Sequence, residues 1–138
     1  MIKWPITYTD YEGNEVTEEF RFALNRSELM EMNFSAAGGM EKMLQKIIDT
    51  KDVKKMIEIF KEIIMKSYGE LSDDGRRFIK TRDGHKLAED FAQTAAYDEL
   101  YMQLATDDKK AADFINGVIP KDLAKQMESQ NVKALPNA

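Results

Sequence analysis

The sequence of 138 residues contains no cysteine and one histidine, His85. The lack of cysteine excludes disulfide bonds, thiolate metal ligands and thiol nucleophiles, and it fits a reducing compartment. A single histidine cannot supply a metal site with two histidine ligands, so we expect His85 to be a plain residue at the start of a helix. No set of nucleophile, base and metal ligands can be named, and we therefore predict no enzymatic activity, no metal and no cofactor.

Long apolar runs and an excess of positive charge are also lacking. No stretch approaches the roughly eighteen apolar residues of a membrane span, and residues 1–5 lack the apolar segment of a secretory signal. The net charge is -5, whereas a protein that neutralises phosphates needs clustered Lys and Arg. We therefore expect a cytoplasmic protein whose partners include neither membrane nor nucleic acid, and the acidic charge disfavours a DNA-binding helix-turn-helix.

The composition is that of a globular protein, with 43% hydrophobic and 33% charged residues. Such usage differs from that of disordered chains, and this length suits one modest core. We predict a single domain over residues 1–128, followed by a polar tail over residues 129–138.

Alternation of apolar and polar residues predicts a β-hairpin over residues 1–24. Ile6 and Tyr8 alternate with threonines, and residues 15–24 place Val16, Phe20, Phe22 and Leu24 on one face. Gly13 and Asn14 lie between the two segments and suit a turn. Because two strands alone are marginal in water, the apolar face must pack on helices.

Residues 25–128 are predicted to be helical. Asn25 and Glu28 resemble a capping box that starts a helix to about Asn33. Gly38 and Gly39 then interrupt helical propensity before a brief helix over residues 40–48. The clearest helix follows Asp52, a candidate N-cap, and ends near Tyr68; its apolar stripe is Val53, Met56, Ile57, Phe60, Ile63 and Ile64.

Three further helices are predicted after a turn at residues 72–75. One spans about 84–93, a second follows a cap at Thr94, and a third follows a cap at Asp107 and ends at Gly117 in the C′ position, with Pro120 beyond. Residues from Lys121 could add a last turn, and the state of residues 76–80 stays undecided. The predicted fold class is mainly α with a small N-terminal β-hairpin, an α+β domain of several helices packed on that hairpin.

Residues 70–81 superficially match a calcium-binding loop. Glu70, Ser72 and Asp74 take its first, third and fifth positions, and Gly75 takes the sixth. The twelfth position is threonine, which cannot replace the bidentate acid of such loops, and two arginines add positive charge. We predict a solvated turn without metal.

Nine methionines are more than a small core requires. Flexible thioethers suit surfaces that adapt to apolar segments of a partner. The alternative is that most of them fill the core, where methionine substitutes freely.

The C-terminal half carries a family resemblance. Residues 91–107 (FAQTAAYDELYMQLATD) and 111–120 (AADFINGVIP) resemble the tail assembly chaperones of long-tailed bacteriophages and prophages. Residues 66–69 (KSYG) with 72–78 (SDDGRRF) are similar to the middle segment of that family, and residues 20–25 (FRFALN) to its N-terminal strand and cap. The resemblance touches most of the chain, through packing and capping residues.

The resemblance implies a protein that binds the tape measure protein and keeps it soluble while tail tube subunits polymerise. It implies action in the bacterial host cell, absence from the finished virion, and the tail tube protein as a further partner; a homo-oligomer stays open. The alternative is another non-enzymatic phage adaptor, acting at the head–tail junction or in regulation.

Five residues left over from the core stripes are candidates for partner binding. Apolar and aromatic side chains of this kind would cover an apolar helical client in a helix-in-groove mode. For each of them core or hinge packing is the alternative. They are Tyr101, Met102, Phe114, Val118 and Ile119.

Overall fold

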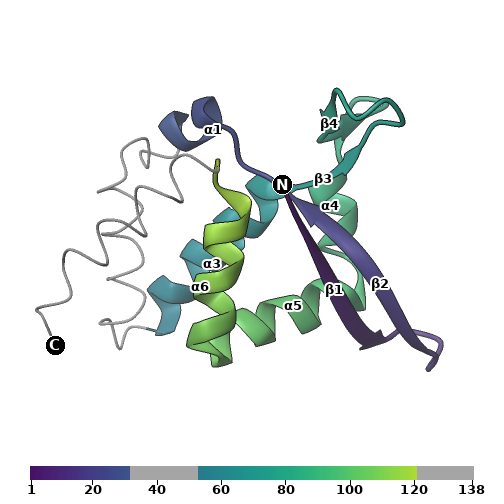
Figure 1. The fold of residues 1–138 in the computed structure, drawn as a ribbon. Helices are drawn as coiled ribbons and strands as arrows, with labels where there is room; N and C mark the ends of the chain where they lie inside the picture. The colour runs from purple at the N-terminus through teal and green to yellow at the C-terminus, as the bar shows by residue number, and fades with distance from the viewer. Residues whose placement is uncertain (32–52, 121–138) are drawn as a thin grey trace, which may run out of the picture.

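The computed structural model describes residues 1–31 and 53–120, with side chains of the second range from residue 57 onward. The chain begins with a long antiparallel hairpin of β1 (Ile2–Thr9) and β2 (Glu15–Phe22), paired without interruption from Ile2 opposite Phe22 to Thr9 opposite Glu15. Its turn is closed by Asp10, whose carboxylate accepts hydrogen bonds from the amides of Glu12 and Asn14 at 2.9 Å. The predicted N-terminal hairpin is confirmed (Figure 1).

Two short strands from the middle of the chain extend this hairpin into a four-stranded antiparallel sheet of order β1-β2-β3-β4. β3 (Tyr68–Leu71) pairs with the end of β2, and β4 (Phe78–Ile79) pairs with β3. β5 (Thr81–Arg82) and β6 (His85–Lys86) form a separate two-stranded ribbon.

The prediction of a mainly α fold with only a small N-terminal hairpin is therefore wrong, because strands β3 to β6 also build part of the domain. The fold is α+β with a four-stranded sheet. The added strands have two to four residues, too few for an alternating pattern to reveal them. β3 also depends on a partner distant in sequence, the end of β2.

The segment that resembles a calcium loop is the turn between β3 and β4. The Ser72 hydroxyl donates to the Asp74 carboxylate at 2.6 Å, and the same carboxylate accepts from the amide of Arg76 at 3.0 Å. These hydrogen bonds hold the pKa of Asp74 below its usual value. Gly75 takes a positive φ of 73°, which glycine adopts without a steric cost. The predicted turn is confirmed.

Five helices are described. α1 (Arg26–Glu31) starts with a capping box, in which the Asn25 side chain accepts from the Glu28 amide at 2.9 Å and the Glu28 carboxylate accepts from the Asn25 amide at 3.0 Å. α3 (Val53–Ser67) is the long amphipathic helix that the apolar stripe predicts. α4 (Leu87–Phe91) is shorter than the predicted helix over 84–93, since His85 and Lys86 belong to a strand.

The caps of the last two helices are confirmed. α5 (Ala95–Thr106) begins at Thr94, whose hydroxyl accepts from the Tyr97 amide at 3.3 Å. α6 (Asp108–Val118) begins at Asp107, whose carboxylate accepts from the amides of Lys109 and Lys110 at 3.1 Å.

The predicted end of the last helix is wrong, because Gly117 lies inside α6 and not in a C′ position. A Cβ at Gly117 would come within 2.1 Å of the side chain of Ile2. Close packing of α6 on β1 therefore explains this glycine, and a left-handed helix end does not.

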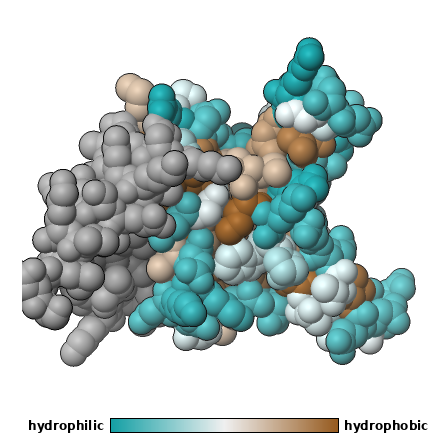
Figure 2. All heavy atoms as spheres, in the orientation of Figure 1, coloured by the Kyte–Doolittle hydropathy of each residue, from teal (hydrophilic) through white to brown (hydrophobic). Residues whose placement is uncertain are grey.

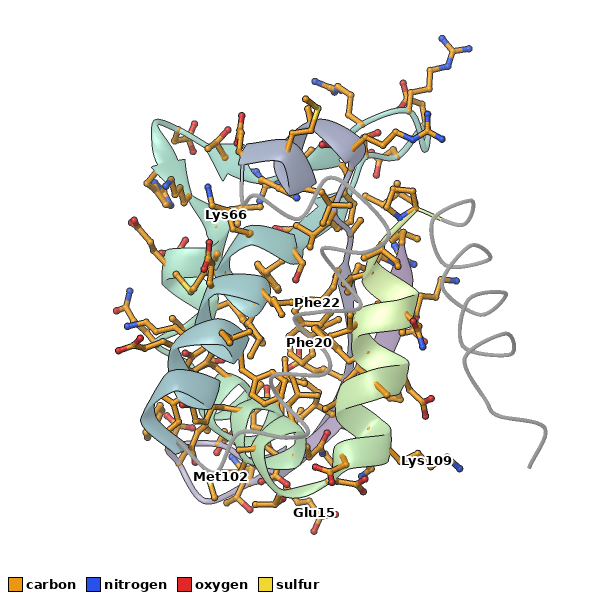
Figure 3. All side chains as sticks on the ribbon, turned by 90° about the vertical axis from the view of Figure 1, so that its left-hand side faces the viewer. Glu15, Phe20, Phe22, Lys66, Met102 and Lys109 are labelled. Atoms are coloured by element: carbon orange, nitrogen blue, oxygen red, sulfur yellow. The ribbon has the colours of Figure 1, made fainter. Side chains whose placement is uncertain are left out.

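The core lies between the inner face of the hairpin and the helices. Phe22 and Phe114, both without exposed surface, meet with ring centroids 5.0 Å apart. α3 adds Phe60, Ile63 and Ile64, and α5 adds Leu100 and Leu104. Phe20 and Phe22 accordingly lie at the centre of the molecule between α3 and α6 (Figure 3).

Lys80 joins three elements that are distant in sequence. Its ammonium group donates to the carbonyl oxygens of Ala23 and Lys66, each at 2.7 Å, and to the carboxylate of Glu28. Burial lowers the pKa of Lys80, and the hydrogen bond with Glu28 opposes this effect. The ribbon after β4 is thereby tied to the end of β2, to α1 and to the C-terminal end of α3, where a cation also interacts favourably with the helix dipole.

Several predictions lie outside the described residues. They are the end of the first helix near Asn33, the interruption at Gly38 and Gly39, the helix over residues 40–48, the cap at Asp52, the last turn from Lys121 and the polar tail over 129–138.

Candidate interaction surface

The described residues offer neither a metal site nor a membrane-spanning helix. In residues 1–31 and 53–120 no group of three or more acidic or histidine side chains could hold a metal ion. Within the same ranges, no helix combines the length and the apolar character of a membrane span. His85 is exposed in β6, and its imidazole contacts the Asp90 carboxylate at 3.0 Å.

The five candidate residues for partner binding fall into two groups. Phe114, Val118 and Ile119 are 0%, 1% and 2% exposed, so contact with a partner there would require α6 to move. Met102 is 50% exposed, and Tyr101 is half-buried. The apolar periodicity of one helix cannot separate these two groups, because the burial of α6 residues depends on how that helix packs on β1.

Met102 and Tyr101 belong to one strip along α5. Tyr97 and Tyr101 are one turn apart, with ring centroids separated by 6.0 Å. Ala105, half-buried, lies one turn beyond Tyr101 and next to Met102 on the helix surface. We call these four residues the α5 surface; Met102 marks its outer side (Figure 3).

The α5 surface continues inward through a row of packed aromatic rings. The ring of Tyr97 meets Phe91 edge-on, with centroids 5.9 Å apart and an angle of 87°, and Phe91 stacks on Tyr68 at 4.3 Å and 7°. Burial raises the pKa of Tyr68, Tyr97 and Tyr101 above the usual tyrosine value. Tyrosine rings can cover apolar surface while their hydroxyls donate hydrogen bonds, as tyrosines at interfaces do.

Four methionines have described side chains, and all four have exposed surface. Met1, Met30 and Met102 are 49%, 64% and 50% exposed, and Met65 is half-buried. For these four residues the surface alternative is therefore favoured over core filling. Flexible thioethers at the surface suit contact with varied apolar side chains.

A shallow hollow of about 350 Å³ lies between β1, α5 and α6. Trp4 forms one wall, donating from its indole nitrogen to Gln103 at 3.4 Å and meeting Phe114 edge-on at 5.3 Å. Lys110 and Asp113 line the opposite side. Trp4 was not among the predicted candidates, although its even-numbered position in the alternating strand places it on the same face as Ile6 and Tyr8.

The face in Figure 2 is mostly hydrophilic, with small hydrophobic patches between α6 and the start of the hairpin and near β4. Small apolar patches within a polar surround are a usual composition of protein contact surfaces. The fold and these surfaces together define a small α+β domain whose exposed thioether and aromatic groups suit contact with other proteins.

The family is shown by comparison with known proteins. The family model described as "phage tail assembly chaperone" matches residues 1–138, so the chain belongs to that family. The resemblance carried by residues 66–120 is confirmed. No curated protein and no solved structure matches the chain.

Proposed function

We propose that this protein binds the tape measure protein of its phage and keeps it soluble while the tail tube polymerises around it. The single observation that carries the proposal is the match of the whole chain to the phage tail assembly chaperone family. A long apolar client aggregates unless its surface is covered, and covering it requires binding without any chemical step.

The α5 surface supports the proposal as the place of contact. Tyr101 and Met102 offer aromatic and thioether groups at the edge of the aromatic row, and an amphipathic helix of the client would lay its apolar face on them. Phe114, Val118 and Ile119 are buried in the described conformation, which favours the alternative of core packing for these three residues.

Co-expression with the tape measure protein tests the proposal, with the soluble fraction of the client as the readout. Met102→Glu places a charge on the contact surface and should lower client affinity about tenfold. Tyr11→Glu is the matched control, since Tyr11 is an exposed aromatic residue at the hairpin tip. A client that stays insoluble with the unaltered protein contradicts the function; equal effects of the two variants contradict only the place of contact.

Two finer parts of the proposal have separate tests. Action in the host cytoplasm before the virion is complete predicts that mass spectrometry of purified virions lacks this chain but finds the tape measure protein. The tail tube protein as a second partner predicts that it is retained with immobilised chaperone and client. Retention of a head–tail protein without the tape measure protein would favour the adaptor alternative.

A further inference from the structure

The two strands of the N-terminal hairpin have different free edges. The amide of Asp10 donates to the carbonyl of Asn14, so the even-numbered positions of β1 direct their backbone groups toward β2. The odd-numbered positions, which include Lys3, Pro5 and Thr7, therefore direct theirs outward. Pro5 has no amide proton, and a proline in an edge strand hinders the addition of another strand.

β2 has a free edge along most of its length. The amide of Ala23 donates to the carbonyl of Ser67, so odd-numbered positions of β2 face the side of β3. Within β2, only Arg21 and Phe22 pair with β3. In the part of the chain that the structure describes, no strand lies beside the outward backbone groups of Glu15, Thr17 and Glu19, and no proline interrupts them.

A depression of about 300 Å³ opens where β2 and β3 separate. Glu19 lines it from β2, and Gly69 and Glu70 line it from β3; the Glu70 carboxylate is ion-paired with Arg82 at 3.1 Å. β3 and β4 turn away from β2 at this end of the sheet, while the hairpin tip projects to the other end (Figure 1). An extended chain could therefore lie along β2 and place one side chain in the depression.

Negative charge follows the free edge. Glu15 and Glu19 are exposed on the outer face of β2, two positions on either side of Thr17, and Glu18 is exposed on the inner face. Arg21, at the end already paired with β3, is the one cationic side chain within β2. Opposite charges on directly facing cross-strand positions are favourable, and like charges are unfavourable.

We propose that the free edge of β2 adds one strand from a protein partner, an extended segment with Lys or Arg at alternate positions. Thr17 exchanges main-chain hydrogen bonds with the added strand, Glu15 and Glu19 face its basic side chains, and the depression takes one of them. Strand addition at an exposed edge is an established mode of peptide binding. This second surface is independent of client binding at α5.

A synthetic peptide of alternating Lys and Val tests the proposal by calorimetric titration of the full chain. Unaltered protein should bind it with a micromolar Kd. Thr17→Pro removes an outward amide and should weaken binding more than tenfold. Thr7→Pro is the matched control: it makes the same change at an outward position of β1, and both variants lose the hydroxyl contact of 2.9 Å between Thr7 and Thr17.

Charge and backbone protection give two further readouts. Glu19→Lys should weaken binding about tenfold, whereas Glu12→Lys in the turn should not. On binding, the amides of Thr17 and Glu19 should exchange hydrogen more slowly, and Met102→Glu should leave peptide affinity unchanged. The proposal is overturned by absent binding at millimolar peptide, by equal binding of a Glu–Val peptide, or by equal loss in the two proline variants.

Discussion

The hairpin of β1 and β2 and the segment from β3 to β6 are both antiparallel, yet they are held in different ways. The hairpin strands have eight residues each and a continuous register, with an inner face that packs on α5 and α6. The strands between Tyr68 and Lys86 have two to four residues. Their positions depend on a few anchors, chiefly Lys80, Gly69 and the turn at Ser72.

This difference indicates in which region a substitution should affect stability least. In the hairpin, stability is distributed over many cross-strand and core contacts, so a surface substitution should have little effect. In the segment over residues 68–86, loss of one anchor should loosen the whole region while the hairpin persists, since local openings follow cooperative units. Four substitutions test this difference in stability between the two regions.

Phe22→Ala should have the largest effect, because Phe22 joins the two regions to the core. Its ring meets those of Phe114, Tyr68 and Phe91 within 6 Å, at 5.0, 5.7 and 5.9 Å, and none of it is exposed. We expect the free energy of unfolding to fall by about 3–5 kcal/mol, measured by urea denaturation. Phe20→Ala, at a half-buried position on the same face, should cost less; a reversed order would contradict the assigned core.

Lys80→Met should destabilise the protein by about 2 kcal/mol, because two carbonyl groups and the Glu28 carboxylate lose their donor. Hydrogen exchange should accelerate over residues 68–86 and at α1 but remain slow in β1. Lys61→Met, on an exposed position of α3, is the control and should change neither stability nor exchange. Uniform acceleration through β1 would show that the two regions open together.

Gly69→Ala should cost about 1–2 kcal/mol through overpacking. The added Cβ would lie 2.5 Å from the Phe78 ring and 2.7 Å from the Ile79 carbonyl oxygen, and that oxygen is fixed in the backbone. Gly117→Ala is the comparison: its Cβ would lie 2.1 Å from Cδ1, 2.9 Å from Cγ1 and 3.0 Å from Cβ of Ile2. These are side-chain atoms, which can shift more easily than a backbone oxygen, and alanine favours the helix, so the net change should be smaller. Thermal denaturation of both variants tests this order, and a costlier Gly117→Ala would reverse our account of the two contacts.

Tyr8→Phe should have the smallest effect, which should be seen as a change in the alkaline part of the stability profile. The hydroxyl of Tyr8 donates to Glu18, which raises the pKa of Tyr8 from 10.0 to about 12. The folded protein therefore holds this proton more tightly than the unfolded chain, and the stabilisation, complete below pH 10, is lost as pH rises from 10 to about 12. Tyr8→Phe should make the alkaline decline of the melting temperature shallower.

The control for that experiment is Tyr11→Phe, at a side chain 83% exposed in the turn. It should leave the pH profile as it is. Part of the decline should persist in Tyr8→Phe, because burial also raises the pKa of Tyr68, Tyr97 and Tyr101. An unchanged profile in Tyr8→Phe would contradict the hydrogen bond to Glu18.

The five candidate residues for partner binding remain a prediction, and the structure separates them only by burial. Met102 and Tyr101 fall outside the stripe of Leu100 and Leu104, and they are exposed and half-buried, respectively. Phe114, Val118 and Ile119 are covered by packing that no single helix pattern contains. The free edge of β2 was missed, since the length of β3 pairing decides where that edge begins.

The features that depend on neighbouring residues could be predicted from the sequence alone: the alternating hairpin, the caps at Asn25, Thr94 and Asp107, and the apolar stripe of α3. Three features depend on the tertiary structure: the pairing of β3 with β2, the reason for Gly117, and the three-way contact of Lys80. Side-chain periodicity and capping act within one or two turns of chain, whereas these features exist because backbone groups and side chains from distant segments satisfy one another when the core closes.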